Sequence, residues 1–444
     1  MKFRSLRPKP RSMKYAHREL SYGIFLSTSV LVSLNVIPRS AIAQQLETPP
    51  TVVQAPIRNE NNQVERGRYI AIAADCVACH TSPGNGSFAG GYKLVTPFGA
   101  IFSSNITPDK ETGIGSWTRE QFEQALRKGK GSHGNLYPAM PYTAYAKMTD
   151  QDVDDLWAYM KSLPPVKHKV IENQLPFPFN IRLSLIFWNW MFFNSSTLAS
   201  RSTDTNEVRR GRYLVEALEH CGTCHTTKNA LGGDKKGHDF QGARLQGWFA
   251  PDITPNDYVG LGTWTTEDIV SYLKTGTNRL MAASGPMTEA IVNSTQHLTE
   301  QDLHAIAAYL KTVSPSSVKP PPPVAVSDPT MRLGKRLYET QCQACHISSG
   351  EGVRHMIPAL ARNPAIQAQD PSSLVNVVLK GGPGPATQTN PTGAAMPGFD
   401  WKLSDSQIAA VLTYIRNSWG NAATVVSADT VGKMRKLQAT TVAN

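Results

Sequence analysis

The sequence predicts a mainly α-helical protein made of three tandem units that share one plan. Three observations predict this fold class. A five-residue motif of Cys and His occurs three times, each copy follows a similar helix-like stretch, and each unit closes with an amphipathic helix. The 444 residues, 40% hydrophobic and 18% charged, are enough for two to four domains. A chain of three small repeats fits this length.

All six cysteines of the chain lie in the repeated motif, at Cys76–His80, Cys221–His225 and Cys342–His346. Each copy reads C-x-x-C-H, the attachment motif for c-type haem. With this Cys and His content, chance predicts about 0.002 matches in the whole chain. Three matches therefore indicate three covalently bound haem c groups, each with an iron.

The spacing of the motif has a mechanical reason. Two thiols three positions apart lie on one side of a helical turn, where they can meet the two vinyl groups on one edge of a haem. The next residue, His, then points at the iron. Zinc sites place two C-x-x-C pairs within ~15–20 residues, and a thioredoxin-like motif occurs once within a β-α-β pattern. Motifs 145 and 121 residues apart, each ending in His, fit neither alternative nor a disulfide framework.

Each unit opens and closes with a predicted helix. The opening stretches share a Gly followed by basic and aromatic residues, at 65–69, 209–213 and 333–338. The closing helices follow a Ser or Thr with an acid or amide three residues on, a capping box, at 149–160, 299–310 and 404–415. Two such helices packed over a covalent haem form the plan of a class I cytochrome c, so we predict three of these domains in tandem.

The sixth iron ligand decides between electron transfer and haem catalysis, because an iron with one His keeps a face open for oxygen or peroxide chemistry. Each unit offers one Met, flanked by Pro, between its motif and its closing helix: Met140, Met287 and Met396. The alternative is that a Met fills core space. Three at one location favour ligation opposite His80, His225 and His346. Met148 and His133 are the rivals in the first unit.

Two further sites support this interpretation. Pro358 stands where cytochromes c place the proline whose carbonyl accepts the ligand His N–H. Trp117 and Trp264, at matching places in the first two units, are predicted to pack in the core or against haem.

The first two units share more sequence than the third. The blocks at 105–108 and 113–118 recur at 252–255 and 260–265, at one offset of 147 residues, and the third unit lacks both. The predicted boundaries are a signal peptide at 1–43, domains at 44–163, 207–314 and 330–420, linkers at 164–206 and 315–329, and a poorly ordered tail at 421–444. The second linker is Pro-rich, which predicts a stiff extended spacer.

Residues 1–43 have the pattern of an export signal, with a basic start, an apolar stretch and small residues at 41–43. An uncleaved anchor is the alternative. This segment holds eight Lys or Arg and one Glu, so the rest of the chain carries only +4 of the net +11. That balance excludes nucleic-acid binding as a function. The most apolar later stretch, 183–193, is predicted as a helix that is either buried or lies in a membrane surface.

The whole arrangement resembles the triheme cytochrome c subunit of membrane-bound dehydrogenases from acetic acid and related Gram-negative bacteria. Besides the haem motifs, the markers are four short blocks at 105–108, 137–142, 178–182 and 395–399, and a fifth at 294–297. The resemblance covers essentially the whole chain after the signal. It implies covalent haem at Cys76, Cys79, Cys221, Cys224, Cys342 and Cys345. It also implies axial His80, His225 and His346 with Met140, Met287 and Met396.

The resemblance further implies a function at the periplasmic face of the inner membrane. In that family a large subunit with FAD or PQQ, in some cases with a small subunit, oxidises gluconate, sorbitol, fructose or alcohols, and the cytochrome passes the electrons to ubiquinone. The block at 175–180 favours the flavin type. Two alternatives stay open, a free periplasmic electron carrier and a haem peroxidase-type enzyme. The chain has no G-x-G-x-x-G after a strand, so substrate oxidation falls to a partner.

Overall fold

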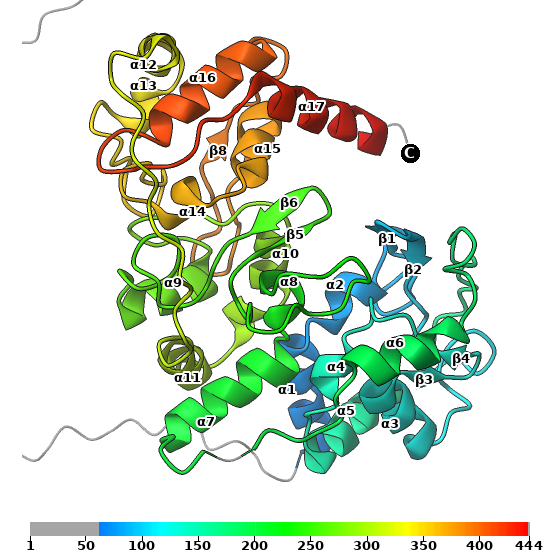
Figure 1. The fold of residues 1–444 in the computed structure, drawn as a ribbon. Helices are drawn as coiled ribbons and strands as arrows, with labels where there is room; N and C mark the ends of the chain where they lie inside the picture. The colour runs from blue at the N-terminus through cyan, green and yellow to red at the C-terminus, as the bar shows by residue number, and fades with distance from the viewer. Residues whose placement is uncertain (1–61, 200, 443–444) are drawn as a thin grey trace, which may run out of the picture. The chain divides into compact units, whose positions relative to one another are not determined.

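The structure is a computed structural model that describes residues 62–199 and 201–442, all within one compact unit (Figure 1). These residues are mainly helical, as the sequence predicts, with four small antiparallel hairpins in the described part. The predicted signal peptide at 1–43 lies outside the described residues. Among the described residues, no helix is both long and apolar enough to span a bilayer.

The first repeat contains five helices and two hairpins. Its helices are α1 (Gln63–Ala73), α2 (Cys76–His80), α3 (Arg119–Lys128), α4 (Tyr142–Tyr145) and α5 (Asp150–Ser162). Its hairpins are β1 (Lys93–Thr96) with β2 (Gly99–Phe102), and β3 (Lys130–Gly131) with β4 (Gly134–Asn135). Lys93 pairs with Phe102 and Lys130 with Asn135 at the hairpin ends. Helix α6 (Ser184–Phe192) follows in the predicted linker.

The second and third repeats also open with a helix, carry the motif on a short helix and have a closing helix after it, but each has one hairpin where the first repeat has two. The second has α7 (Asn206–Tyr213), the π-helical turn η1 (Leu214–Leu218), α8 (Gly222–His225), β5 (Ala243–Leu245), β6 (Trp248–Ala250), α9 (Thr266–Thr275), α10 (Pro286–Asn293), the 3₁₀ turn η2 (Thr295–His297) and α11 (Glu300–Leu310). The third has α12 (Pro329–Gln341), α13 (Gln343–His346), α14 (Pro364–Gln367), α15 (Ser372–Lys380), β7 (Gly382–Pro383), β8 (Ala395–Met396), α16 (Asp405–Ile415) and α17 (Ala428–Val442).

Opening and closing helices pack together in every repeat, as α1 with α5, α7 with α11 and α12 with α16. A glycine sits at each crossing. A Cβ added at Gly67, Gly211 or Gly334 would overlap a backbone carbonyl oxygen of the closing helix and crowd the Cβ of a tyrosine there. The glycine shared by the three opening stretches therefore lets two helix backbones touch.

Replacing Gly334 by Ala should destabilise the third repeat by about 2 kcal/mol or more. Overpacking costs about 1–3 kcal/mol, and here the neighbour is backbone that cannot turn aside. Thermal or denaturant unfolding measures the change, with Lys335→Ala on the exposed side of α12 as the matched control, expected within about 0.5 kcal/mol of the parent. Equal stability of the two variants would show that the crossing is looser than described.

The first two repeats share one hydrophobic core. Buried side chains of α1 and α5 form a single cluster with those of η1, α9 and α11. The third repeat has two clusters of its own around α12, α15 and α16. It joins the second repeat through Ala359, which belongs to the shared cluster, and through polar contacts such as Asn363 Nδ2 donating to the Leu280 carbonyl (3.1 Å) and the Arg244–Asp370 ion pair. The first two repeats are thus one folding body, and the third docks onto it.

Two tyrosines reciprocally join the first two repeats. The Tyr69 hydroxyl on α1 donates to Asp302 at the start of α11 and accepts from the Thr299 N–H (3.2 Å). In the mirrored contact, the Tyr213 hydroxyl donates to Asp152 at the start of α5. It also accepts from the backbone N–H of the N-cap residue there (3.2 Å).

These contacts correct part of the predicted capping boxes. The N-cap side chains of α5, α11 and α16 accept from the N3 backbone N–H as predicted. The return bond from the N3 side chain to the N-cap backbone forms only in α16 among these three helices. In α5 and α11 the N-cap backbone N–H donates instead to a tyrosine hydroxyl from the other repeat. That hydroxyl in turn donates to Asp152 or Asp302, the N3 residue of the helix.

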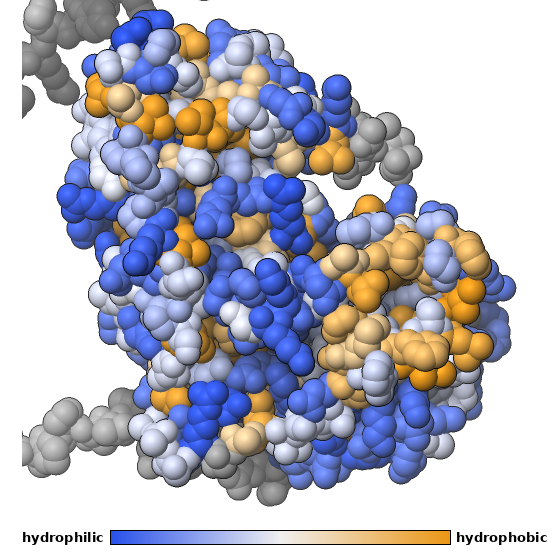
Figure 2. All heavy atoms as spheres, viewed as in Figure 1, coloured by the Kyte–Doolittle hydropathy of each residue, from blue (hydrophilic) through white to orange (hydrophobic). Residues whose placement is uncertain are grey.

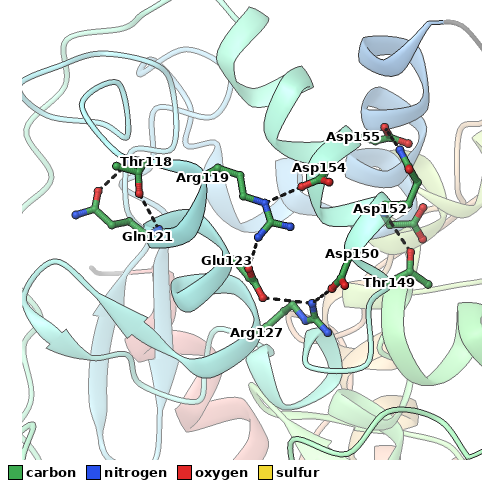
Figure 3. Close-up of polar contacts among 11 residues, drawn as sticks. Thr118, Arg119, Gln121, Glu123, Arg127, Thr149, Asp150, Asp152, Asp154 and Asp155 are labelled. Atoms are coloured by element: carbon green, nitrogen blue, oxygen red, sulfur yellow. Dashed lines mark hydrogen bonds and ion pairs between the residues drawn. The ribbon is translucent and has the colours of Figure 1, made fainter.

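Ion pairs fix α3 on the outside of α5 (Figure 3). Arg119 bridges Glu123 of its own helix and Asp154 of α5, with 2.6 Å between Arg119 Nε and Asp154 Oδ1. About two turns later Arg127 repeats this arrangement with Glu123 and Asp150. These ion pairs tie α3 to α5 and account for the charged side chains gathered there.

The predicted spacer and the predicted C-terminal tail differ in how much regular structure they contain. The predicted spacer at 315–329 has no regular structure before α12 begins at Pro329, and its Ser316 carbonyl accepts from Asn256 Nδ2 (2.8 Å). The expectation of a poorly ordered tail was wrong for 428–442, because these residues form α17. Buried Val431 and Met434 place α17 against the core of the third repeat. The pattern was missed because the helix carries only these few apolar anchors.

Candidate haem-binding sites

Each C-x-x-C-H motif lies on a short helix directly after an opening helix. The residue before the motif turns the chain into a left-handed conformation in the first two repeats, at Asp75 (φ 46°) and His220 (φ 38°). In the third repeat Cys342 makes the turn with φ −122°. The turn separates the motif from the helix crossing. All six thiols are free of disulfides.

The structure fixes the tautomer of all three motif histidines. The Nδ1 atoms of His80, His225 and His346 lie 2.7, 2.7 and 3.1 Å from the backbone carbonyl oxygens of Ser104, Pro251 and Pro358. A carbonyl only accepts, so Nδ1 carries the proton and Nε2 keeps its lone pair.

Burial also lowers the pKa of each of these imidazoles, which favours the neutral form that a metal ligand needs. The predicted role of the Pro358 carbonyl as acceptor is confirmed. The matching acceptors Ser104 and Pro251 were missed. The 147-residue offset between the first two repeats pairs these two positions and could have shown them.

One connected cavity of about 2530 Å³ runs past all three motifs. Its wall includes every residue that the sequence predicts for haem attachment and ligation: Cys76, Cys79, His80, Met140, Cys221, Cys224, His225, Met287, Cys342, Cys345, His346 and Met396. All twelve predicted residues therefore line a single cavity in the structure. Whether they bind haem as predicted stays a prediction.

The candidate methionines sit on three different local structures. Met140 lies in a turn before α4, and Met396 lies in β8 beside β7. Met287 stands in the first turn of α10, because Pro286 starts a helix there. Met148 is buried in the core away from the cavity, while His133 is exposed at its edge.

The cavity wall also holds methionines that the sequence analysis did not consider. These are Met160, Met191, Met281 and Met356. Met356 is 58% exposed, and Met160 is buried in the core. Several methionines line the cavity, so the sixth iron ligand is identified by substituting each candidate methionine in turn.

Polar atoms without partners also face this cavity. Among the described residues, Trp264 Nε1, Asp75 Oδ1 and Asp252 Oδ2 are buried with no hydrogen-bond partner, and all three residues line the cavity. Buried polar groups normally find partners, so these atoms indicate that a polar ligand belongs there. Trp264 is a core residue on the cavity wall and Trp117 packs against the same core, as predicted.

Burial favours the protonated form of five of the six motif thiols by raising their pKa. It raises the pKa of Cys76 to about 12 and those of Cys79 and Cys342 to about 11. Buried thiols of this kind are poor redox or metal-site nucleophiles. Their donor set instead fits thioether bonds to a haem, with an imidazole on the iron and a thioether sulfur available on the same wall.

Two buried carboxyls lie between the first and second motifs. Burial raises the pKa of Asp75 to about 8 and holds the pKa of Glu219 well above its ordinary value. The Ser294 hydroxyl donates to Glu219 (3.1 Å). The sequence analysis missed both groups, although each stands just before a motif cysteine.

The family model of cytochrome c matches three regions, 64–164, 208–314 and 331–419. The chain belongs to the cytochrome c family. The three matches coincide with the three repeats, and family membership implies covalently bound haem c in this cytochrome.

Curated relatives of this cytochrome are subunits of dehydrogenases. It is 37% identical to the "Gluconate 2-dehydrogenase cytochrome c subunit" of Pantoea cypripedii, over 90% of this chain and 95% of that one. It is 39% identical to the "Alcohol dehydrogenase (quinone), cytochrome c subunit" of Gluconacetobacter polyoxogenes, over 89% of each chain. It is 37% identical to the "Fructose dehydrogenase cytochrome subunit" of Gluconobacter japonicus, over 95% and 90%. The resemblance deduced from the sequence is therefore confirmed.

Proposed function

We propose that this cytochrome is the electron-transfer subunit of a membrane-bound dehydrogenase at the periplasmic face of the inner membrane. It carries three haem c groups in tandem class I domains and passes electrons from the substrate-oxidising subunit to ubiquinone. The observation that carries the proposal is the single cavity on which all three motifs open, with each motif imidazole held by a carbonyl.

The residues of this chain have distinct tasks in holding the haems. The paired thiols Cys76/Cys79, Cys221/Cys224 and Cys342/Cys345 attach them. The Nδ1–H bonds orient His80, His225 and His346, and Met140, Met287 and Met396 close the opposite faces. Haem c then supplies one-electron iron chemistry, and a closed iron favours electron transfer over oxygen chemistry.

The arrangement of the repeats supports an electron relay. Helix α10 of the second repeat packs on α2, which carries the first motif, and the Cys79 and Cys224 thiols are close enough to interact electrostatically. The third repeat contacts the second through β6 and α15. Short separations between cofactors are what electron transfer requires, so the second haem stands between the other two in the relay.

The partner supplies substrate oxidation. The relatives named above serve gluconate, alcohol and fructose dehydrogenases, with identities of 37% to 39%. Because these sequence identities are nearly equal, they do not distinguish an FAD-containing partner from a PQQ-containing one. The segment at 175–180 favours the flavin type, as its sequence suggests.

Purification of the tagged chain from detergent-solubilised membranes tests the proposal. A large FAD- or PQQ-containing subunit should co-purify in about equal amount, and adding its substrate should reduce the haems. The cofactor released on denaturation identifies the partner. Recovery of the cytochrome alone from the soluble periplasm would favour a free electron carrier instead.

A further inference from the structure

Helix α6 presents a continuous apolar stripe to the outside. Leu183 and the four residues Ile186, Phe187, Trp190 and Met191 are 71%, 54%, 70%, 83% and 44% exposed. Their spacing of three and four residues is that of one helix face. Figure 2 shows hydrophobic side chains gathered over this part of the surface. A stripe of large side chains left in solvent on a well-packed protein indicates an interaction surface.

The opposite face of α6 anchors it to both of the first two repeats. Trp188 Nε1 donates to the Leu231 carbonyl (2.9 Å), and Asn189 accepts from the Tyr142 hydroxyl (2.7 Å). Leu185 is only 7% exposed. The helix is therefore held in one orientation, and the stripe is not its core-facing side. This divides the predicted apolar segment into a buried half and an exposed half.

The stripe continues into the loop before the helix. Phe177, Phe179 and Ile181 are 79%, 40% and 43% exposed. The Phe179 carbonyl accepts from the Tyr137 hydroxyl (3.1 Å), which ties this loop to the first repeat. We call the loop residues and the stripe together the α6 face. Apart from the indole N–H of Trp190, its exposed side chains carry no hydrogen-bonding atom.

The charges around the α6 face are mostly basic, and Asp234, an acid in the turn that contacts Trp188, pairs with Lys228. From residue 173 to 203 the sequence has Arg182 and Arg201 and no acid. The β3–β4 hairpin, which accepts from Arg182 Nη1 at Asn135 (2.8 Å), carries exposed Lys128 and Lys130 at its start. On the other side, the turn that contacts Trp188 continues into exposed residues 235–236, both Lys. An apolar stripe within a basic rim complements an anionic lipid surface.

We propose that the α6 face docks the protein onto an anionic bilayer, with the stripe at the acyl boundary and the lysines among the headgroups. The nine residues of α6 extend only ~14 Å, so the helix lies in the surface and does not cross it. A rim of lysines and arginines around an apolar stripe matches the charge of anionic headgroups above an acyl layer. The occupant is therefore lipid.

This docking would place the first haem site next to the bilayer. Leu185, Phe187, Trp188 and Met191 line the same cavity as the first motif, so α6 separates that cavity from the lipid side. The inference deepens the proposed function and rests on it in one respect, that the electron acceptor lies in the membrane. The binding of the surface to lipid can be tested without any acceptor.

The experiment uses the purified full-length holoprotein and flotation with lipid vesicles. The variant L183S/I186S/W190S removes three outward side chains that do not line the cavity. The matched control is the variant Val326→Ser, Trp401→Ser and Val425→Ser, at positions 82%, 80% and 57% exposed elsewhere on the surface. The parent and the control should bind phosphatidylglycerol vesicles better than phosphatidylcholine vesicles. The stripe variant should bind vesicles at least about tenfold more weakly than the parent, and its haem spectrum should be unchanged.

A second variant tests the basic rim. Changing Lys128, Lys130, Lys235 and Lys236 to Ala should abolish the preference for anionic vesicles, and salt should weaken parent binding in the same way. Equal vesicle binding by parent and stripe variant overturns the proposal. So does a stripe variant that stays on vesicles but loses the large dehydrogenase subunit, since that result assigns the face to a protein.

Two controls keep the outcomes distinct. If the triple substitution lowers the haem content, the single variant Trp190→Ser, at an 83% exposed position outside the cavity wall, decides by the same assay. Substrate-driven haem reduction in the purified complex tests the proposed function separately. Its absence in the parent would overturn the electron-transfer role and leave the lipid-binding result standing.

Discussion

A strain that lacks the machinery for cytochrome c maturation should accumulate no stable full-length chain. The cavity of about 2530 Å³ is walled by residues of the hydrophobic core, such as Leu156 and Ile306, so without haem this wall meets water. Unfilled core space costs about 24 cal/mol per Å³. If only about a fifth stayed unfilled, the cost of ~12 kcal/mol would equal the whole stability of a typical protein.

The way the repeats share their cores sharpens this prediction. Cys342→Ala with Cys345→Ala should unfold only the third repeat, because its clusters are separate. Cys76→Ala with Cys79→Ala should destabilise the first and second repeats together, because they share one core. Limited proteolysis of the exported protein, followed by mass spectrometry of the fragments, separates the two patterns. A stable, protease-resistant chain without haem would contradict the role assigned to the cavity.

Replacing Met396 by Ala should open one iron of the three. With the proposed ligation of each iron by an imidazole and a thioether, the reduced parent should bind no carbon monoxide and the variant should bind one molecule per chain. The potential of that haem should fall, since a thioether ligand favours the reduced iron. Carbon monoxide difference spectra and a redox titration measure the two effects.

The third repeat supplies a matched control for the methionine. Met356→Ala changes another methionine on the same cavity wall, 58% exposed, and should leave all three irons closed. If Met356→Ala opened the iron and Met396→Ala did not, the ligand assignment would be wrong. In the second repeat, Met281→Ala and Met287→Ala make the same comparison.

The sequence predicted the helices that define each repeat. Caps at Thr149, Thr299 and Ser404 and the apolar spacing that follows them are local signals, and α5, α11 and α16 begin where these signals stand. The helical nature of 184–192 followed from its composition. Its division into two faces did not, because both faces are apolar and only the contacts of Trp188 and Asn189 distinguish them.

Contacts between repeats could not be predicted from the sequence. Tyr69 and Tyr213 reach acids more than 60 residues away, and no local pattern marks such pairs. The site was easier to predict, because two cysteines and a histidine follow one another in the chain. Its supporting atoms were harder, since the carbonyls of Ser104 and Pro251 carry no side-chain signal.

The most direct test of the central claim is the number of electrons that substrate delivers to the haems of the purified dehydrogenase complex under anaerobic conditions. An electron relay of three haems predicts that excess substrate, without quinone, reduces three haems per cytochrome chain, one for each C-x-x-C-H motif. Adding ubiquinone should then reoxidise all three. A complex in which the substrate-oxidising cofactor becomes reduced while the haems stay oxidised would contradict the account.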